Sequence, residues 1–293
     1  MTETNFHNKI KEILNQEGIE IFASIPFEKV KVINERLLPR DFSPKSVLLI
    51  AVPYRAHAEN TDGLNVGIFA RCKDYHLFFK ELYERILPKI AFVHGGKSLG
   101  FADTSPIDEK DAALKAGLGF RGRNGLVTNS RLGSYIFIGS ILFEHALPID
   151  AVAPIDGAKE PYFSTLCDSC LKCVKCCPTG ALGTVDSNGI FERTKCLSHI
   201  SQKKKKSDDE QKELAETKTL WGCDICQSVC PFNSLPVETI PSFFESGYIS
   251  NFSFELLDKM PEDEFKTYAF SYRDKKVIVE NFLTTSSDCD IIV

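Results

Sequence analysis

The sequence of 293 residues lacks long apolar runs and a marked excess of either charge. No run approaches the ~20 apolar residues of a membrane span, and the polar N-terminus does not resemble a secretory or transit signal. We therefore expect no membrane partner and a cytoplasmic location, where thiols stay reduced. The net charge of −5 argues against a protein that grips phosphate with its whole surface, but it leaves a local basic patch open. The six histidines show no metal-ligand pairing.

Cysteine, by contrast, is abundant, with eleven residues gathered mainly in the second half of the chain. The first run reads C-x-x-C-x-x-C-x-x-x-C-P and ends at Cys177-Pro178, which is the spacing of a bacterial ferredoxin-type cluster site. The second run, from Cys223 to Cys230, lacks the first cysteine of that pattern, and Cys196 lies alone between the runs. This pattern predicts two 4Fe–4S clusters.

The spacing also predicts the ligands, because the cysteine before each proline reaches towards the other cluster. One cluster takes three cysteines of the first run and the last of the second: Cys167, Cys170, Cys173 and Cys230. The other takes the remaining set, which Cys196 completes: Cys177, Cys196, Cys223 and Cys226. Cys72, Cys176 and Cys289 are left over. Cys176 is the rival of its neighbour Cys177, and the proline after Cys177 favours Cys177.

Structural zinc and disulfides are the alternative uses of these cysteines. Zinc would be expected to use two separate C-x-x-C pairs, rather than a third cysteine at the same short step followed by Cys-Pro. Disulfides would need an oxidising compartment. The pattern therefore favours iron–sulfur clusters over both.

Helical and strand-like segments alternate before the cysteines, which predicts an α/β domain. The apolar run 46–52 predicts a buried strand, and 98–102 predicts a strand that ends at Asp103. Further strands are expected at 19–24, 126–128 and 135–142, and helices at 10–16, 27–38, 74–90, 108–116, 209–217, 254–259 and 277–283. We expect a catalytic α/β domain at 1–155, a ferredoxin-like domain at 156–241 and a short helical tail at 242–293.

A glycine motif at 117–122 matches G-x-G-x-x-G, the fingerprint of dinucleotide-binding folds. That fingerprint must follow a strand and open a helix, so that phosphate meets free helix N–H groups. Here the glycines follow the predicted helix 108–116, which is the reverse order. We therefore expect these glycines to end a helix and to allow a close approach of the backbone.

Further motifs follow one another between Ser46 and Asn233. They include Asp74-Tyr75-His76, Asp103-Thr-Ser-Pro106 with Glu109-Lys110, the segments 116–124 and 132–139, the cysteine pattern with Cys196, and Trp221-Gly-Cys-Asp-Ile-Cys-Gln-Ser-Val-Cys-Pro-Phe-Asn233. In this order, the motifs resemble the epoxyqueuosine reductase family. Lys110 stands where the family has arginine, and the chain stops where a segment resembling the first helical repeat begins.

The resemblance implies a nitroreductase-like cobalamin domain, also found in reductive dehalogenases, followed by a ferredoxin-like domain with two 4Fe–4S clusters. Family members reduce the epoxide of epoxyqueuosine in transfer RNA, with base-off cobalamin and electrons from an external low-potential donor. The absence of a D-x-H-x-x-G motif fits base-off cobalamin. The family's proton donor corresponds to Asp103, and we expect burial beside the cofactor to raise its pKa. The residues expected to contact the cofactor are Asp103, Ser134, Phe137, Ile138 and Ser198.

Alternatives stay open at several of these positions. Asp103 could instead cap the helix that begins near Pro106, and a structural hydrogen bond would explain His76. The lysines at 203–206 suit either a solvated loop or a phosphate contact. Because the helical repeats that help bind tRNA are missing, a dehalogenase-like reductase of a small molecule is the second functional hypothesis. An electron-transfer protein without its own substrate is the third, although the long segment before the cysteines exceeds what a carrier needs.

Overall fold

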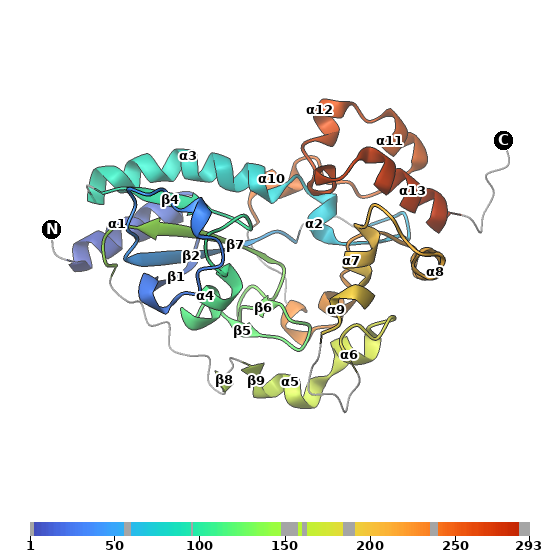
Figure 1. Cartoon of the computed structure of the whole chain (residues 1–293), viewed down its shortest axis with the longest axis horizontal. Coiled ribbons are helices and arrows are strands. Elements are labelled where there is room, and N and C mark those ends of the chain that lie inside the picture. Colours follow the sequence, from blue (N-terminus) through green and yellow to red (C-terminus); the bar gives the residue numbers. More distant parts are fainter. Residues whose placement is uncertain are drawn as a thin grey trace.

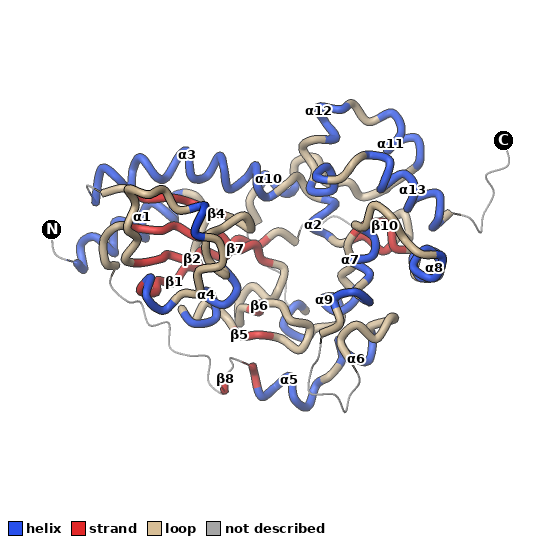
Figure 2. The backbone as a smooth tube through the Cα atoms, viewed as in Figure 1, coloured by secondary structure: helices blue, strands red, loops and turns tan. Residues whose placement is uncertain are grey.

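The computed structural model describes residues 3–55, 60–94, 96–147, 158–159, 163–183, 191–234 and 240–286. A central sheet with its covering helices forms the N-terminal part, and the cysteine-rich segment and the C-terminal helices lie towards one end of it (Figure 1). Figure 2 shows that the longer strands belong to this sheet, whereas short helices and loops dominate the cysteine-rich segment. Within the described residues, no helix is long and apolar enough to cross a membrane.

The central sheet has four strands in the order β1 (Ile21–Pro26), β2 (Ser46–Pro53), β7 (Ile136–Phe143) and β4 (Ser98–Phe101). All three strand pairs are antiparallel. The predicted strands are therefore confirmed, and because the pairs are antiparallel this part is a mixed α+β arrangement. An unbroken apolar run such as that of β2 is typical of a strand buried on both faces, whichever way its neighbours run.

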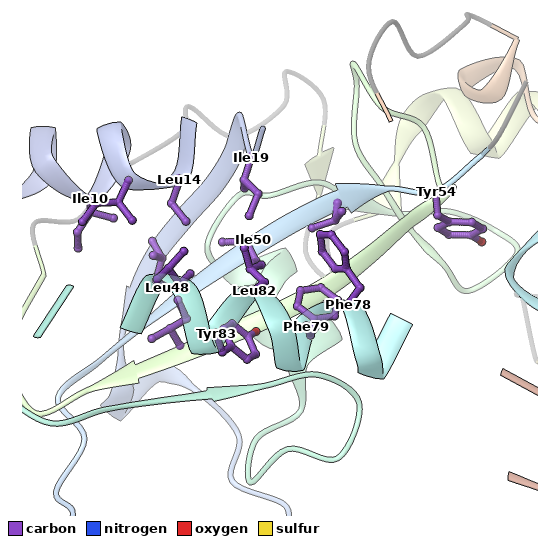
Figure 3. Close-up of a cluster of buried hydrophobic side chains, with 14 of the residues drawn as sticks. Ile10, Leu14, Ile19, Leu48, Ile50, Tyr54, Phe78, Phe79, Leu82 and Tyr83 are labelled. Carbon is purple, nitrogen blue, oxygen red and sulfur yellow. The ribbon is translucent and has the colours of Figure 1, made fainter. Parts of the chain in front are cut away.

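Helices cover one face of β2, which explains why the side chains on that face are apolar. Leu48 and Ile50 pack in one hydrophobic cluster with α1 (Glu3–Gln16) and α3 (Tyr75–His94) (Figure 3). Alternate residues of a strand point to opposite faces, so the residues between them belong to a second cluster. α3 confirms the helix expected at 74–90, and α1 begins earlier than the helix expected at 10–16.

The other face of the sheet is covered by α4 (Glu109–Lys115). Val47 and Leu49 of β2 pack there with the alanines of this helix. α4 is followed by its cap Ala116 and then by Gly117, whose φ of 77° lies in the left-handed region that glycine adopts readily. The glycine motif therefore does follow a helix, as the sequence indicates.

The helix expected at 27–38 is wrong. The segment contains only two short 3₁₀ turns, Phe27–Lys29 and Glu35–Leu37. Its backbone bonds to another loop instead: the N–H groups of Ile33 and Asn34 both donate to the carbonyl of Pro106. Tertiary hydrogen bonds have thus replaced the helical ones, and they brace the loop that follows Asp103.

Short strands connect the N-terminal part with the cysteine-rich segment. β3 (Asn65–Val66) pairs in parallel with β10 (Thr219–Trp221). β5 (Phe120–Arg121) pairs with β6 (Val127–Thr128) and, in parallel, with β9 (Phe163–Ser164). β9 also pairs with β8 (Ala158–Lys159). The β3–β10 and β5–β9 pairs join residues far apart in the chain, so the N-terminal part and the cysteine-rich segment share backbone hydrogen bonds.

The remaining helices are short. The expected helix at 209–217 is α8, which begins with a capping box between Ser207 and Glu210. Besides α1, α3 and α4, the described helices are α2 (Ile68–Arg71), α5 (Thr165–Cys170), α6 (Lys172–Cys176), α7 (Leu197–Ser201), α8 (Asp208–Glu216), α9 (Ile225–Ser228), α10 (Ser242–Glu245), α11 (Phe254–Lys259), α12 (Glu262–Phe265) and α13 (Lys275–Thr285). α11 and α13 confirm the helices expected at 254–259 and 277–283.

The C-terminal helices pack against the rest of the protein. One hydrophobic cluster contains Val66, Trp221 and Val277, which come from all three of the expected domains. Phe244 of α10 belongs to the core beneath α3. Asn281 of α13 is buried and donates two hydrogen bonds of 2.8 Å to backbone carbonyls beside the cysteine-rich segment. The domain limits stay predictions, while the core runs across them.

A buried ion pair ties α2 to the C-terminal helices. Arg71 and Asp62 form two parallel contacts of 2.8 and 2.9 Å, and their side chains are 0% and 2% exposed. Arg71 also donates 3.0 Å to the carbonyl of Ile249, and the N–H of Phe252 donates 2.9 Å to Asp62. Removing one partner of such a pair leaves the other charge buried without compensation.

We predict that Arg71→Met lowers the free energy of unfolding by about 3–5 kcal/mol, because it leaves Asp62 charged and buried. The single tryptophan, Trp221, lies in the adjoining hydrophobic cluster, so its fluorescence during urea denaturation measures the effect. The control is Lys276→Met, which removes an exposed partner of Glu280. It should cost less than about 1 kcal/mol. Equal effects of the two substitutions would contradict the prediction.

Candidate active site and iron–sulfur centre

The first predicted ligand set surrounds one cavity. Cys167, Cys170, Cys173 and Cys230 all line a space of about 340 Å³ between α5, α6 and the turn after Cys230. Burial, followed by the charges of the other three thiols, raises the pKa of Cys173 to about 11. The structure thus brings together the four cysteines that the spacing assigned to one cluster.

One buried polar atom of a residue that lines this cavity has no hydrogen-bond partner in the part of the chain that the structure describes. The Nε of Arg123 is buried and has no hydrogen-bond partner among the described residues. Arg123 lines the cavity together with Gly122 and Lys172. A cluster held by thiolates accepts hydrogen bonds at its sulfurs. The donor set and the unpaired Arg123 therefore both fit a cluster in this cavity.

Three cysteines of the second predicted ligand set, Cys196, Cys223 and Cys226, lie near one another. Burial is the main cause of the raised pKa of Cys226. The charges of four neighbours raise this pKa further: Cys223, Asp224, Cys173 and Cys196. Cys196 also contributes to the raised pKa of Cys223, whose main cause is burial. Because the interaction between two charges weakens with distance, these effects indicate that Cys196 lies near Cys223 and Cys226. Its predicted role as the completing ligand therefore fits the structure, although the two runs of sequence do not include it.

Cys177 and the unassigned cysteines differ in their surroundings. The thiol of Cys177 lies 3.8 Å from the hydroxyl of Thr179, and its ligand role stays a prediction. Cys176 is exposed at the end of α6. Cys72 is buried in the core, where burial raises the pKa of its thiol to about 12. Cys289 lies outside the described residues.

No group of three or more His, Cys, Asp or Glu side chains in the described ranges converges on a single-ion site. The ligands of a 4Fe–4S cluster bind four different irons, so its thiols need not meet at one point. The first cysteine set is instead defined by the cavity that it lines. Cys196, Cys223 and Cys226 of the second set are related by their mutual charge effects.

Asp103 lies directly after β4, as predicted, in an unusual backbone conformation. Its φ is 61°, in the left-handed region that few residues other than glycine adopt. Its N–H donates 2.8 Å to Oε2 of Glu109. Its carboxylate is 70% exposed and lies 3.8 Å from Nε2 of His76, which is an ion-pair distance and longer than a hydrogen bond.

The alternative role of Asp103 as a helix cap is wrong. The cap of α4 is Asp108, whose side chain accepts a hydrogen bond from the N–H of Asp111. The expectation that burial beside the cofactor raises the pKa of Asp103 stays a prediction. His76 lowers this pKa, and that effect outweighs the opposing effect of burial.

His76 stands between two carboxylates at the start of α3. Its Nδ1 lies 2.7 Å from Oδ1 of Asp74, and the same oxygen accepts 2.9 Å from the backbone N–H of His76. Asp103, first, and Asp74 raise the pKa of His76 to about 9. At neutral pH the imidazole is therefore protonated and Asp103 is ionised. The structural hydrogen bond proposed for His76 exists, and the second carboxylate adds a charged pair to it.

An aromatic surface continues from this pair. Tyr75 stacks on His76 with ring centres 4.1 Å apart, Phe137 stacks on Tyr75 at 4.4 Å, and Tyr54 stacks on Phe137 at 4.1 Å. Phe137 and Ile138 are neighbours on β7, so their side chains point to opposite faces and pack with different hydrophobic clusters. Only Phe137 of the two belongs to this surface. The cofactor contacts of both residues stay predictions.

Ser134 connects the end of the sheet to the cysteine-rich segment. Its N–H donates 2.7 Å to Oδ1 of Asn233, whose Nδ2 donates 2.9 Å to the Ser134 hydroxyl. That hydroxyl donates 2.9 Å to Oε1 of Gln227. The hydroxyl is thus already used inside the protein, so a contact of Ser134 with a cofactor would have to involve other atoms. The sequence motif 221–233 contains Asn233 and Gln227 but does not indicate this role, because neither residue bears a charge or a metal-binding group.

Ser198 follows Cys196 at the start of α7. Its carbonyl accepts 2.6 Å from Nε2 of Gln202, which also donates 3.2 Å to the Ser198 hydroxyl. Gln202 in turn contacts the C-terminal segment, since the Tyr272 hydroxyl and Nε of Arg273 both donate to it. Ser198 therefore lies between a cluster ligand and the C-terminal helices, and its cofactor contact stays a prediction.

The chain is similar in sequence to known proteins. The family model of the 4Fe–4S double cluster binding domain matches residues 166–233. An epoxyqueuosine reductase of Listeria monocytogenes is 30% identical over 295 residues, which cover 92% of this chain and 71% of the relative.

Two solved structures share the fold. A crystal structure of epoxyqueuosine reductase with an epoxyqueuosine-modified tRNA stem loop superposes with a TM-score of 0.78 at 22% identity. The match covers 98% of this chain and 82% of that one. A reductive dehalogenase described for B12-dependent dehalogenation superposes with a TM-score of 0.51 at 17% identity, over 94% of this chain and 37% of that one. The identity to the Listeria protein over most of both chains shows that this chain belongs to the epoxyqueuosine reductase family.

Proposed function

We propose that the protein reduces the epoxide of epoxyqueuosine in tRNA to an alkene. The observation that carries this proposal is the protonated His76 beside the exposed carboxylate of Asp103, at the end of an aromatic surface that leads to the cysteine sets. Removing the epoxide oxygen as water consumes two electrons and two protons. The structure offers a proton store on one side and thiols for electron-transfer clusters on the other. A tRNA substrate further supports a cytoplasmic location.

The cofactors that this reaction needs fit residues of the chain. Two 4Fe–4S clusters would be held by the two cysteine sets, and base-off cobalamin would lie against Phe137 and Tyr75, the partly exposed members of the aromatic surface. When bound, these groups supply the two electrons, which an external low-potential donor provides. We propose that residues 1–155 form a nitroreductase-like cobalamin domain, 156–241 a ferredoxin-like domain, and 242–293 a helical tail that supports both.

The acid side of the reaction belongs to the protein. Because the pKa of His76 is raised to about 9, His76 keeps its proton at neutral pH. Asp103 stabilises that imidazolium and, at 70% exposure, can reach a substrate that lies above it. The proton of His76 can therefore pass through the Asp103 carboxylate to the departing oxygen as the C–O bond breaks, and solvent returns a proton to His76 and supplies the second proton of the water that forms. A positioned acid of this kind contributes ~10²–10⁴-fold.

The lysines at 203–206 are not equivalent. Lys203 pairs with Glu210 at 2.5 Å, and the ammonium of Lys206 is partly buried and donates to the carbonyl of Lys203. Lys204 and Lys205 are exposed. They follow Gln202, which holds Ser198 and contacts Tyr272. We propose that Lys204 and Lys205 contact tRNA phosphates near the active site.

The first prediction concerns the clusters. The reconstituted protein should bind about eight irons, and Cys196→Ala should lose one cluster selectively, because Cys196 completes only one ligand set. Cys176→Ala is the matched control and should keep both clusters, since Cys177 is the ligand. Iron analysis and electron paramagnetic resonance measure the outcome. An unchanged iron content and spectrum in Cys196→Ala would remove this residue from the ligand set.

The second prediction concerns the acid pair. Asp103→Asn should lower kcat by ~10²-fold or more, because the amide cannot transfer an acidic proton. Asparagine tolerates the left-handed backbone of this position, so the loop should keep its shape. The substitution also removes the main cause of the raised pKa of His76, so the loss of activity with rising pH, expected near pH 9 in the unsubstituted protein, should move to lower pH.

The measurements are pH profiles of kcat, together with cobalamin binding and cluster reduction, which should not change. Asp41→Asn is the control, since Asp41 is exposed and pairs with Lys97 at the far end of β4. Full activity in Asp103→Asn would exclude the acid role. Loss of cobalamin binding would instead assign Asp103 to holding the cofactor.

The third prediction concerns tRNA. Replacing Lys204 and Lys205 together by alanine should weaken binding of an epoxyqueuosine-modified tRNA stem loop. The slope of log K against log salt should become shallower by about 0.9 for each lost phosphate contact. Lys259→Ala with Lys276→Ala makes the same change of charge on α11 and α13 and should leave the slope unchanged. If the unsubstituted protein binds no tRNA at low salt, a small-molecule substrate would be favoured instead.

A further inference from the structure

The loop that carries Asp103 is built around a partly buried carboxyl group, that of Glu109, to which no role has yet been assigned. We propose that Glu109 is a positioning residue, whose carboxyl holds the backbone of Asp103 in the left-handed conformation that places the Asp103 carboxylate beside His76. This inference rests on the proposed function for its catalytic consequence. Its structural part concerns only the loop.

One carboxyl group connects the loop to the central sheet. Oε2 of Glu109 accepts 2.8 Å from the N–H of Asp103, and Oε1 accepts 2.5 Å from the hydroxyl of Ser140 on β7. Ser140 is fully buried, so its position is fixed by the sheet. Glu109 itself begins α4, whose cap is Asp108. The carboxyl therefore transmits the rigid position of β7 to the backbone of residue 103.

The conformation of Asp103 needs such support. The left-handed region is disfavoured for residues other than glycine, although aspartate and asparagine adopt it more readily than most. The carboxylate of Asp103 is 70% exposed, so packing of this side chain does not hold the residue in place. The next residues form tight turns, with the N–H of Thr104 bonded to the carbonyl of Ala102 and the N–H of Ser105 to that of Asp103. Among these contacts, only the bond to Glu109 ties the backbone of Asp103 to α4 and the sheet.

The surroundings of Glu109 allow it to work in either protonation state. Burial raises its pKa to about 7, and the nearby charge of Asp103 adds to this effect. The other titratable groups that feel its charge are Tyr83 and Tyr75 of α3. When Glu109 is neutral, its O–H can donate to the Ser140 hydroxyl while its other oxygen still accepts from Asp103, because a hydroxyl both donates and accepts.

This chemistry makes glutamine a stringent test. In Glu109→Gln, the amide oxygen can accept from the N–H of Asp103, and the amide N–H can donate to Ser140. In Glu109→Ala both hydrogen bonds are lost. The matched control is Asp108→Asn, which changes the preceding residue but keeps the helix cap, since asparagine caps about as well as aspartate.

The first measurement is hydrogen–deuterium exchange of a peptide spanning residues 101–106. Glu109→Ala should accelerate exchange in this peptide and leave the peptides of β2 and α3 unchanged. Glu109→Gln and Asp108→Asn should exchange like the unsubstituted protein. Unchanged exchange in Glu109→Ala would overturn the proposal. So would an effect as large in Glu109→Gln, because the charge and not the hydrogen bonds would then hold the loop.

The second measurement is turnover. Glu109→Ala should lower kcat by up to ~10²-fold, as a misplaced catalytic group does, with KM and the affinity for cobalamin unchanged. In the Asp103→Asn background it should lower kcat no further, because Glu109 acts only through Asp103. An equal loss in both backgrounds would overturn the positioning role.

The two measurements separate this inference from the proposed function. If neither the unsubstituted protein nor any variant reduces epoxyqueuosine, the reductase proposal fails. The exchange of the 101–106 peptide still decides whether Glu109 holds the loop, since that readout requires neither substrate nor cofactor.

Discussion

The arrangement of this protein depends on a buried hydrogen-bond network between the end of the sheet and the cysteine-rich segment. Ser134 contributes its N–H and hydroxyl, and Asn233 and Gln227 bind both of them at 2.7–2.9 Å. Gln227 also donates 2.7 Å to Asp224, which in turn accepts the N–H of Ile68. Every one of these side chains is buried, so each partner left without a bond would cost the full desolvation of a polar group. The network therefore fixes the cysteines relative to β7 and the aromatic surface on it.

The geometry of this contact leaves no room for variation at one position. A Cβ on Gly133 would lie 2.1 Å from Oδ1 of Asn233, and the φ of Gly133 is 69°. Only glycine satisfies both constraints, because it has no Cβ and adopts a positive φ without strain. Electron transfer between bound cofactors and proton delivery at a substrate require fixed distances. A rigid polar contact between the two parts meets that requirement better than an apolar contact, which is less directional.

The acid site uses a different principle. His76 and Asp103 are partly exposed, and the pKa values of both are displaced by their mutual charge more than by burial. An exposed pair can reach a large substrate such as a nucleotide in RNA. It must then be positioned by groups behind it, and Asp74, Glu109 and Ser140 provide those contacts. The protein thus keeps its reactive groups accessible, and the groups that hold them are less exposed: Asp74 and Glu109 are partly buried and Ser140 is fully buried.

The sequence by itself determined the double-cluster cysteine pattern, the strands β2, β4 and β7, the helices α3 and α4, and the place of Asp103 at a strand end. These features follow from local patterns: fixed cysteine spacing, apolar periodicity and a glycine at a helix end. Only the tertiary structure decided that the sheet is antiparallel, that 27–38 bonds to the Pro106 loop, and that Ser134 faces Asn233. It also decided the charge of the acid pair, because His76 and Asp103 are far apart in sequence and shift each other's pKa only when folded. Contacts between distant segments set each of these properties, and no local pattern encodes them.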